Sequence, residues 1–397
     1  MQVQQYRATR ADINLDALRA NYEAFRGALS PQTQLLCCVK GNAYGHGAVE
    51  ISRELERLGT DYLSVAFLDE AIELRQQGIR MPILVLGYTG PAGISAAYEY
   101  DITLNVFTED VLEAIAELVL DSSERKLKAH IKIDSGMGRI GLLTNVAVDF
   151  ITRAFQVPQL EIEGMFTHFA KADELDKSYT LEQYERFQQV NMQLRELGYS
   201  IPIIHTGNSA TAIDTPELSP QMVRIGIALY GLYPSAEVNE QAIELTPVLT
   251  LKTEVTYVKQ LPDHSKVSYG GKYVTESDEY IATLPIGYAD GYSRMLTGVA
   301  EVLIRGRRVP VVGTICMDQC MVSLKSFAEE AEEIQIGEEV VLIGRQQDAV
   351  ITADELASKL GTIHYEVVCM IAARVPRAYY RNNAIVTLWN PLTQFTN

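Results

Sequence analysis

Residues 35–47, LLCCVKGNAYGHG, pass from an apolar segment into a lysine and then into a glycine-rich segment. This order is typical of a strand in an α/β barrel, where catalytic side chains stand at the carboxyl end of the strand. An amine at Lys40, partly desolvated by the apolar strand, would be a nucleophile for an aldehyde, which points to Schiff-base chemistry. This segment alone equally allows a lysine that reaches solvent, so the rest of the chain has to decide.

Seven more apolar segments follow in the first 240 residues, at 62–67, 82–88, 102–106, 128–134, 160–169, 201–208 and 222–231. Between them lie amphipathic segments with helical spacing, at 48–58, 68–77, 108–118 and 181–197. Eight strands that alternate with helices predict a (β/α)8 barrel, which we place at residues 12–243.

The pattern changes after residue 243. Segments at 248–261, 280–286, 301–322 and 338–343 alternate or are continuously apolar and are separated by turn residues, which predicts strands. One helix is expected there, beginning with a capping box at Thr352 and Glu355. The predicted fold class is α/β: a barrel followed by a mainly β domain at residues 244–397, which residues 1–11 are expected to join.

Composition and net charge exclude some classes of partner and site. The 397 residues carry 51 acidic and 34 basic side chains, a net charge of −17, which argues against nucleic acid or an anionic membrane as partner. Neither a leader segment nor a long apolar run is evident, so a cytoplasmic protein is expected. The five cysteines are odd in number and fit reduced thiols, and Cys316 and Cys320 lack a second half-site for zinc, so no metal is expected.

Polar side chains gather where the predicted strands end. Lys132 lies in the predicted strand at 128–134. Charged side chains that point into the mouth of a barrel require an anionic partner nearby. Arg139 follows that strand and is suited to a carboxylate. His168 ends the next strand, and a histidine there is by itself more often a hydrogen-bonded core residue.

The last two strands end in candidates for phosphate binding. Loops after the seventh and eighth strands of such barrels commonly bind phosphate through backbone N–H groups and a hydroxyl, and Ser209, Gly226 and Ile227 lie there. A lysine for an aldehyde together with a phosphate site predicts pyridoxal 5'-phosphate as cofactor.

At this point the chain resembles the alanine racemase family, the fold-type III pyridoxal-phosphate enzymes, over nearly its whole length. The resemblance rests on motifs in the same order: VKGNAYGHG at 39–47, IKIDSGMGR at 131–139, THF at 167–169, HTGNS at 205–209, RIGIALYGL at 224–232, VSYG at 267–270, LPIGYADGY at 284–292, CMDQ at 316–319 and RVPR at 374–377.

The resemblance implies two catalytic bases. Lys40 would be the Schiff-base lysine and the base on one face of the substrate Cα, and Tyr269 its counterpart on the other, contributed across a homodimer interface. Racemisation requires this arrangement because the proton leaves one face and returns on the other. Without the family, Tyr269 would pass for a packed strand residue.

The remaining roles also come from the resemblance. Tyr44, Ser209, Gly226 and Ile227 would contact the phosphate, His168 the ring face, Arg224 the pyridine nitrogen, Arg139 and the Met317 backbone the substrate carboxylate, and Tyr288 the entry corridor; Asp318 would support the site. Lys132 resembles a lysine that is often carbamylated, and the alternative is an ion pair with an acid such as Asp134.

Two positions depart from the family. Gly41 replaces the usual alanine, which is expected to loosen the backbone after Lys40. Ala373 replaces a tyrosine that usually helps to hold the phosphate, which leaves space near the substrate side chain and keeps serine open as a substrate.

The sequence predicts a cytoplasmic racemase that converts L-alanine to D-alanine, supplying peptidoglycan. Serine racemisation, or dual activity, is the close alternative. An amino-acid decarboxylase of the same fold is less favoured, because the two-base pair and the motif MDQ at 317–319 favour racemisation. A non-catalytic cofactor-binding protein is disfavoured because such proteins are short single barrels that lack the β domain and Tyr269.

Overall fold

The chain forms two compact units. The computed structural model describes residues 6–121 and 125–393, so residues 1–5 of the segment expected to join the β domain lie outside the described residues. The first unit, here called the barrel, comprises residues 18–43 and 48–246. The second, the β unit, takes the described residues up to Ala17, Tyr44–Gly47 and those from Pro247 onward.

The barrel contains the eight predicted strands. They are β2 (Gln34–Cys38), β3 (Tyr62–Val65), β4 (Ile83–Val85), β5 (Leu104–Val106), β6 (Leu127–Asp134), β8 (Leu160–Phe166), β9 (Ile203–His205) and β10 (Met222–Ile225). They form two parallel sheets, β10-β2-β3-β4 and β5-β6-β8-β9. The N–H of Val85 donates to Thr103 at 2.9 Å and that of Arg224 to Gly207 at 3.2 Å, which joins the sheets at both edges and confirms the barrel.

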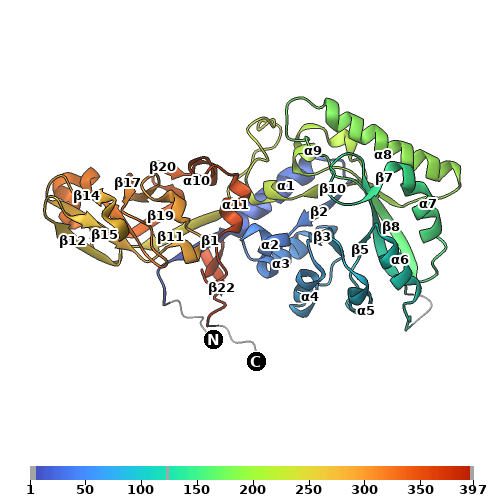
Figure 1. Ribbon diagram of the computed structural model, residues 1–397, viewed down its shortest axis with the longest axis horizontal. Helices are drawn as coiled ribbons and strands as arrows, with labels where there is room; N and C mark the ends of the chain where they lie inside the picture. The colour runs from blue at the N-terminus through green and yellow to red at the C-terminus, as the bar shows by residue number, and fades with distance from the viewer. Residues whose placement is uncertain (1–5, 122–124, 394–397) are drawn as a thin grey trace. The chain divides into compact units, whose positions relative to one another are not determined.

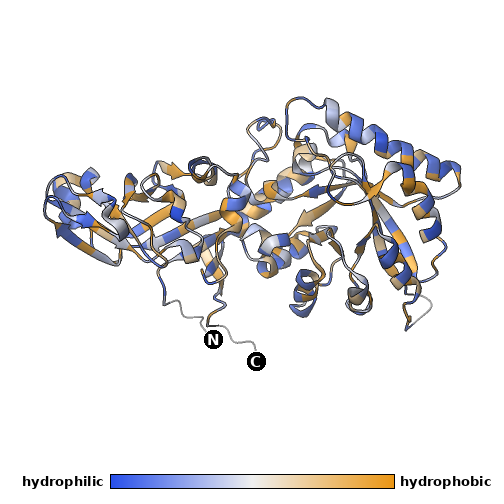
Figure 2. Ribbon diagram, in the orientation of Figure 1, coloured by the Kyte–Doolittle hydropathy of each residue, from blue (hydrophilic) through white to orange (hydrophobic). Residues whose placement is uncertain are grey.

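Helices surround these strands (Figure 1). They are α1 (Leu15–Ala28), α3 (Ala48–Leu58), α4 (Leu68–Gln76), α5 (Ile94–Glu99), α6 (Glu109–Ala116), α7 (Thr144–Ala154), α8 (Ser178–Glu196) and α9 (Ser209–Asp214). In α3, Ile51 and Leu55 are fully buried one turn apart, as the helical spacing predicts. Figure 2 shows strands that are largely hydrophobic and a mostly hydrophilic α8, so the apolar core lies around the strands.

The β unit is built on one long sheet. Its strands are β1 (Arg10–Asn14), β11 (Leu249–Glu254), β12 (Tyr257–Leu261), β15 (Glu279–Leu284), β16 (Glu301–Ile304), β17 (Arg307–Val312), β18 (Cys320–Ser323), β19 (Glu339–Gln346), β20 (Ala349–Ile351), β21 (Arg377–Arg381) and β22 (Ala384–Trp389). The order is β12-β15-β18-β17-β16-β19-β11-β1-β21-β22, with β20 on β19. Alternate residues of β11 are buried, so one of its faces covers the core.

The prediction of one helix in the β unit was wrong. Helix α10 (Ala353–Leu360) begins at Thr352, whose side chain accepts the N–H of Glu355 at 3.0 Å, as expected. A second helix, α11 (His364–Cys369), follows. It has only six residues, two of them valines, and no side chain caps its start, so the sequence carries no helical signal strong enough to find it.

Two further observations concern the whole chain. No helix in the described ranges is both long and apolar enough to span a bilayer. All five cysteines are free, and Cys37, Cys38 and Cys320 are buried. Burial raises the pKa of the Cys37 thiol to about 12, so it stays protonated at neutral pH.

Candidate active site

Lys40 opens a left-handed helical turn at the end of β2. This turn, α2 (Lys40–Tyr44), has positive φ angles at Gly41 (61°), Asn42 (55°), Ala43 (54°) and Tyr44 (51°). Left-handed helical backbone costs an L-residue about 1–2 kcal/mol, so three side chains here oppose the conformation and only Gly41 adopts it freely. The sequence predicted only a glycine-rich segment at this point, and the left-handed turn is a finding of the structure. That Gly41 loosens the backbone stays a prediction.

Hydrogen bonds from neighbouring segments stabilise this turn. The carboxylate of Glu70 accepts the N–H of Gly41 at 2.7 Å and that of Ala66 at 2.7 Å. The Asn42 Oδ1 accepts the N–H of Ala48 at 2.9 Å. Lys40 is therefore held in place by its backbone, and Glu70, which the sequence analysis did not single out, is one of the residues that hold it.

Arg224 on β10 is buried in the barrel core. Its Nη1 donates to His205 Nδ1 at 3.0 Å, and its Nη2 donates to Thr167 O at 2.9 Å, Thr206 O at 3.0 Å and His168 Nδ1 at 3.1 Å. Burial lowers the guanidinium pKa to about 10, so it remains charged at neutral pH. The acceptors fix the plane of the guanidinium.

This geometry fits a pyridine ring. A guanidinium can only donate hydrogen bonds. Both Nη atoms of Arg224 donate to protein acceptors, whereas its Nε–H has no acceptor among the described residues. Buried donors are normally paired, so the Nε–H is suited to a ring nitrogen that accepts. Burial and nearby cations, Arg224 first among them, keep the pKa of His168 well below its usual value, so it is neutral and accepts.

Lys132 on β6 is a buried lysine with no acid beside it. Its Nζ lies 4.3 Å from the ring centre of Phe166, and no carboxylate of the described residues is within ion-pair distance. Asp134 instead accepts the N–H groups of Gly136 and Gly138, each at 3.0 Å. Burial, followed by the positive charges of Arg224 and Arg139, lowers the pKa of Lys132 well below its usual value. Both effects favour the neutral form of the amine.

Three of the four candidates for phosphate binding lie together in the barrel, and the fourth, Tyr44, belongs to the β unit. Ser209, Gly226 and Ile227 are buried, and the Ser209 Oγ accepts the N–H of Gly226 at 2.8 Å. The Ser209 hydroxyl proton remains to donate to an anion. Arg139 is exposed on the loop after β6, and its guanidinium has no partner among the residues that the structure describes.

In the β unit, Tyr269 has a fixed backbone and a free side chain. Its carbonyl accepts from Thr314 Oγ1 at 2.8 Å, and the neighbouring Ser268 donates through Oγ to Thr314 O at 2.6 Å. The Tyr269 side chain is nevertheless 74% exposed. A packed strand residue would be buried, so the structure contradicts that simpler interpretation of Tyr269.

Tyr288 and Met317 lie on two segments joined by backbone hydrogen bonds. The N–H of Tyr288 donates to Cys316 O at 3.1 Å, and that of Ala289 to Met317 O at 3.0 Å. A Cβ on Gly287 would meet Cys316 O at 2.2 Å, so only glycine allows this approach. The N–H of Met317 has no acceptor among the described residues, which leaves it available to a carboxylate.

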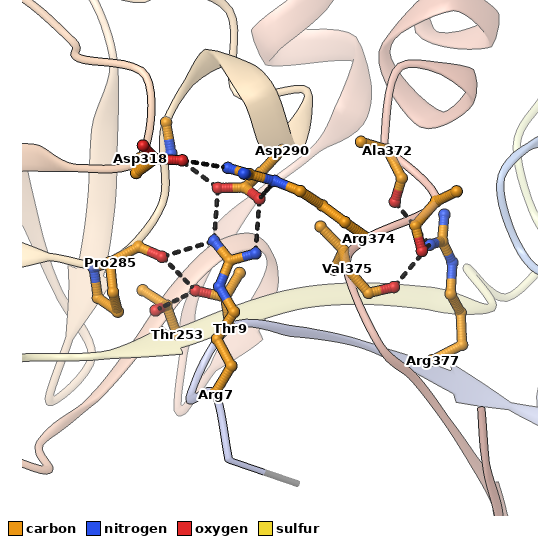
Figure 3. A network of polar contacts seen from close by, with 12 residues as sticks. Arg7, Thr9, Thr253, Pro285, Asp290, Asp318, Ala372, Arg374, Val375 and Arg377 are labelled. Atoms are coloured by element: carbon orange, nitrogen blue, oxygen red, sulfur yellow. Dashed lines mark hydrogen bonds and ion pairs between the residues drawn. The ribbon is translucent and has the colours of Figure 1, made fainter. Parts of the chain in front are cut away.

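Asp290, fully buried, stabilises these segments (Figure 3). Arg7 donates to its two carboxylate oxygens at 2.6 and 2.5 Å, and Arg374 Nε donates at 2.7 Å. Arg374 also donates through Nη2 to Asp318 at 2.6 Å, so Asp318 is connected to the same cluster. In the sequence, Asp290 and Arg374 are recognisable only as parts of motifs, and nothing in the chain order pairs either of them with Arg7.

Tyr44 and Ala373 belong to a second polar cluster in the β unit. Tyr44 is buried, and its carbonyl lies 2.9 Å from His46 Nδ1. The buried Arg377 donates to Gly45 O at 3.1 Å and to Ile371 O at 2.7 Å, so it connects the turn after Tyr44 to the segment that contains Ala373. Ala373 itself is exposed.

Comparison with known proteins agrees with this arrangement. The family models "Alanine racemase, N-terminal domain" and "Alanine racemase, C-terminal domain" match residues 13–234 and 248–379. An alanine racemase of Methanococcus maripaludis is 45% identical over 93% of this chain and 98% of its own, and one of Clostridium tetani is 43% identical over 96% and 97%. The solved alanine racemase of Clostridium difficile superposes with a TM-score of 0.92 at 42% identity, covering 98% of this chain and 99% of that one. Because family models match most of both units and these relatives match over nearly the whole chain, the chain belongs to the alanine racemase family.

Proposed function

We propose that this chain interconverts L- and D-alanine with pyridoxal 5'-phosphate, using Lys40 and Tyr269 as the two bases. The observation that carries the proposal is Arg224, a buried guanidinium whose Nε–H has no protein acceptor in the described part of the barrel. A cation that donates there leaves the ring nitrogen unprotonated, which weakens the electron sink and favours racemisation over side reactions.

The other candidate functions find no support. Every relative reported above is described as an alanine racemase, which does not favour a serine racemase, a decarboxylase or a non-catalytic protein. The exposed Ala373 alone does not carry a second function.

The cofactor and the residues of the protein supply different parts of the proposed chemistry. When bound, pyridoxal phosphate withdraws electron density from the substrate Cα, so that its proton can leave. Lys40 then holds or returns a proton on one face of Cα, and the Tyr269 phenol does so on the opposite face. Arg139 and the Met317 N–H hold the substrate carboxylate, and Tyr288 borders the path by which the substrate enters.

The phosphate is held by Ser209, Gly226, Ile227 and Tyr44. At the end of the barrel where the last two strands finish, Ser209 presents its hydroxyl and Ile227 its backbone N–H. The N–H of Gly226 donates to Ser209 Oγ and so orients that hydroxyl.

Lys132 is proposed to be carbamylated. A neutral, buried amine among cations is the form that reacts with carbon dioxide, and the product carries a negative charge beside Arg139. The modification would turn a buried amine with no acid at ion-pair distance among the described residues into an ion-pair partner of Arg139.

The proposed assembly is a homodimer in which Tyr269 completes the site of the neighbouring subunit. A base that is 74% exposed in one chain is consistent with cover from a second copy. We place the enzyme in the cytoplasm, where its free cysteines stay reduced, and assign its product to peptidoglycan synthesis.

A panel of L- and D-amino acids, scored for chiral inversion by the purified protein, tests this function. Alanine should be the preferred substrate, and the protein should absorb visible light when loaded with cofactor. Lys40→Ala should lose inversion in both directions while still binding pyridoxal phosphate. Unchanged inversion by Lys40→Ala would refute the assignment.

A further inference from the structure

We propose that Glu163 is the counter-charge of Arg224, transmitted through His130 and His205, and that Glu163 and His130 are positioning residues for the guanidinium. The inference rests on the proposed contact between Arg224 and the cofactor ring. It concerns Glu163, His130 and His205, none of which has a role in the mechanism above.

Four side chains form one continuous hydrogen-bonded chain through the barrel core. Arg224 Nη1 lies 3.0 Å from His205 Nδ1, and His205 Nε2 lies 2.8 Å from His130 Nδ1. His130 Nε2 lies 3.4 Å from Glu163 Oε2. Both imidazoles are fully buried, so each ring nitrogen depends on this chain for its partner.

The two ends determine the direction of every bond. A guanidinium can only donate, so His205 Nδ1 accepts and its proton sits on Nε2. His205 Nε2–H must then donate to His130 Nδ1, which leaves the His130 proton on Nε2. A carboxylate can only accept, so His130 Nε2–H donates to Glu163. Donor and acceptor match at all three contacts only when both histidines are the neutral Nε2–H tautomer.

The charges agree with this direction. Burial would raise the pKa of Glu163, but hydrogen bonds from His130 and Tyr62 and the charge of Lys128 lower it to about 2. Burial lowers the pKa of His130. It lowers the pKa of His205 well below its usual value. At neutral pH the chain therefore has a carboxylate at one end, a guanidinium at the other and neutral rings between.

Arg224 has no carboxylate of its own. No ion pair joins it to an acid among the described residues, although an isolated buried charge is costly. Hydrogen bonds polarise one another in a low-dielectric interior, so the carboxylate of Glu163 makes His130 and then His205 stronger acceptors. The Nη1 contact is thereby strengthened, and with it the orientation in which Nε faces the cofactor.

The local backbone positions the side chains of this hydrogen-bonded chain. Ala129 pairs with Ile162 and His130 with Gly164, so Glu163 is an extra residue in β8, a β-bulge that re-aims its side chain. A Cβ on Gly164 would lie 2.4 Å from His130 Nδ1, so the ring fits only against a glycine. Phe166 stacks on His205 at 4.7 Å between ring centres and 5° between planes. Bulge, glycine and aromatic ring together fix the two imidazoles.

The first experiment observes the histidines in cofactor-free protein. The chain has six histidines, so selective 15N labelling gives a resolvable spectrum. We expect both His130 and His205 as neutral Nε2–H tautomers in the wild type. Glu163→Gln keeps the side-chain shape and removes the charge, so the ring-nitrogen shifts of His205 should move although Glu163 does not touch it. Glu161→Gln, on the same strand and exposed, is the matched control and should move neither histidine.

The second experiment measures the affinity for pyridoxal phosphate by equilibrium dialysis. Glu163→Gln should weaken binding about five-fold, because a charged acceptor becomes a neutral one. In a double-mutant cycle with His130→Phe, which cuts the chain but keeps the ring volume, Glu163→Gln should have no further effect.

Three results would overturn the proposal: an Nδ1–H tautomer at either histidine, a His205 spectrum unaffected by Glu163→Gln, or additive losses of affinity in the cycle. A variant that fails to fold leaves the wild-type tautomers as the deciding measurement. Wild-type protein that binds no pyridoxal phosphate would refute the proposed function, while the spectra would still test the chain.

Discussion

At the scale of single residues, the turn after Lys40 depends on a backbone conformation that side chains resist. Gly41 is the first of five consecutive residues with positive φ, and nothing lies within 4 Å of the place where its Cβ would be. The effect of a side chain there is therefore conformational and not steric. Strain of this kind persists only where surrounding contacts impose it, as Glu70 and Asn42 do here.

Gly41→Ala is expected to lower the free energy of unfolding by about 1 kcal/mol, because alanine resists the left-handed region. Denaturant unfolding measures it. Gly27→Ala is the matched control: Gly27 also has open space around it, but it lies in α1 without a positive φ. Its replacement should stabilise by about 0.5 kcal/mol. Equal shifts in the two variants would contradict the conformational explanation.

Tyr269→Phe separates the two faces of the substrate. The variant should keep cofactor binding but lose Cα hydrogen exchange for one alanine enantiomer by about 10²–10⁴-fold, the usual contribution of a general base. Exchange with deuterated solvent, followed separately for each enantiomer, measures this. Tyr257→Phe, another exposed tyrosine of the β unit, is the control. Near-normal exchange for both enantiomers would exclude Tyr269 as a base.

At the scale of elements, Asp290 connects segments that are remote in the sequence. Through Arg7 and Arg374, Asp290 joins the segment before β1 to the segment after α11 (Figure 3). Arg7 also donates to the carbonyl oxygen of Pro285, just after β15, at 2.8 Å. The turn with Tyr288 and the segment with Met317 are thereby held by a charge cluster and not by a regular sheet. Breaking the cluster should affect stability and site geometry together.

Asp290→Asn is expected to destabilise the protein by about 3 kcal/mol at neutral pH, because two arginines lose a buried carboxylate. Burial would raise the pKa of Asp290, but the hydrogen bonds from Arg7 and Arg374 lower it below 3.8. Because the pKa of Asp290 is lower in the folded state, the stability that its charge contributes is fully present above pH 3.8. It is lost as the pH falls through the folded-state pKa of Asp290.

Urea unfolding over a series of pH values measures the difference between wild type and Asp290→Asn, which should shrink in acid. Asp348→Asn, an exposed aspartate of the same unit, should change little at any pH. A difference that stays constant down to the acid limit would show that the charge of Asp290 does not carry the effect.

At the scale of the whole molecule, the proposed dimer predicts complementation. Lys40→Ala and Tyr269→Phe subunits are each expected to be inactive. Mixed in equal amounts with subunit exchange, half of the dimers should be mixed and contain one intact site each, which restores about a quarter of wild-type activity. A subunit carrying both substitutions, mixed with Lys40→Ala, should restore none. Absence of recovery after verified exchange would show that each site is built within one chain.

The sequence determined the barrel because strand and helix patterns are local. Segments such as 48–58 bury apolar residues at helical spacing wherever they fold, and the structure has α3 at those residues. The motifs likewise identified the family, since Lys40, Arg224 and their neighbours are short runs of particular side chains. Short elements without caps, such as α11, carry no such local signal.

Only the tertiary structure decided which distant side chains meet. Glu163, His130, His205 and Arg224 come from four strands and form one hydrogen-bonded chain, because those strands are neighbours in the barrel and a bulge turns Glu163 toward His130. The left-handed turn after Lys40 is likewise imposed by Glu70 against the preference of its own residues. Pairing between remote groups and strain held by remote contacts are properties of the folded chain, because each depends on atoms that chain order does not bring together.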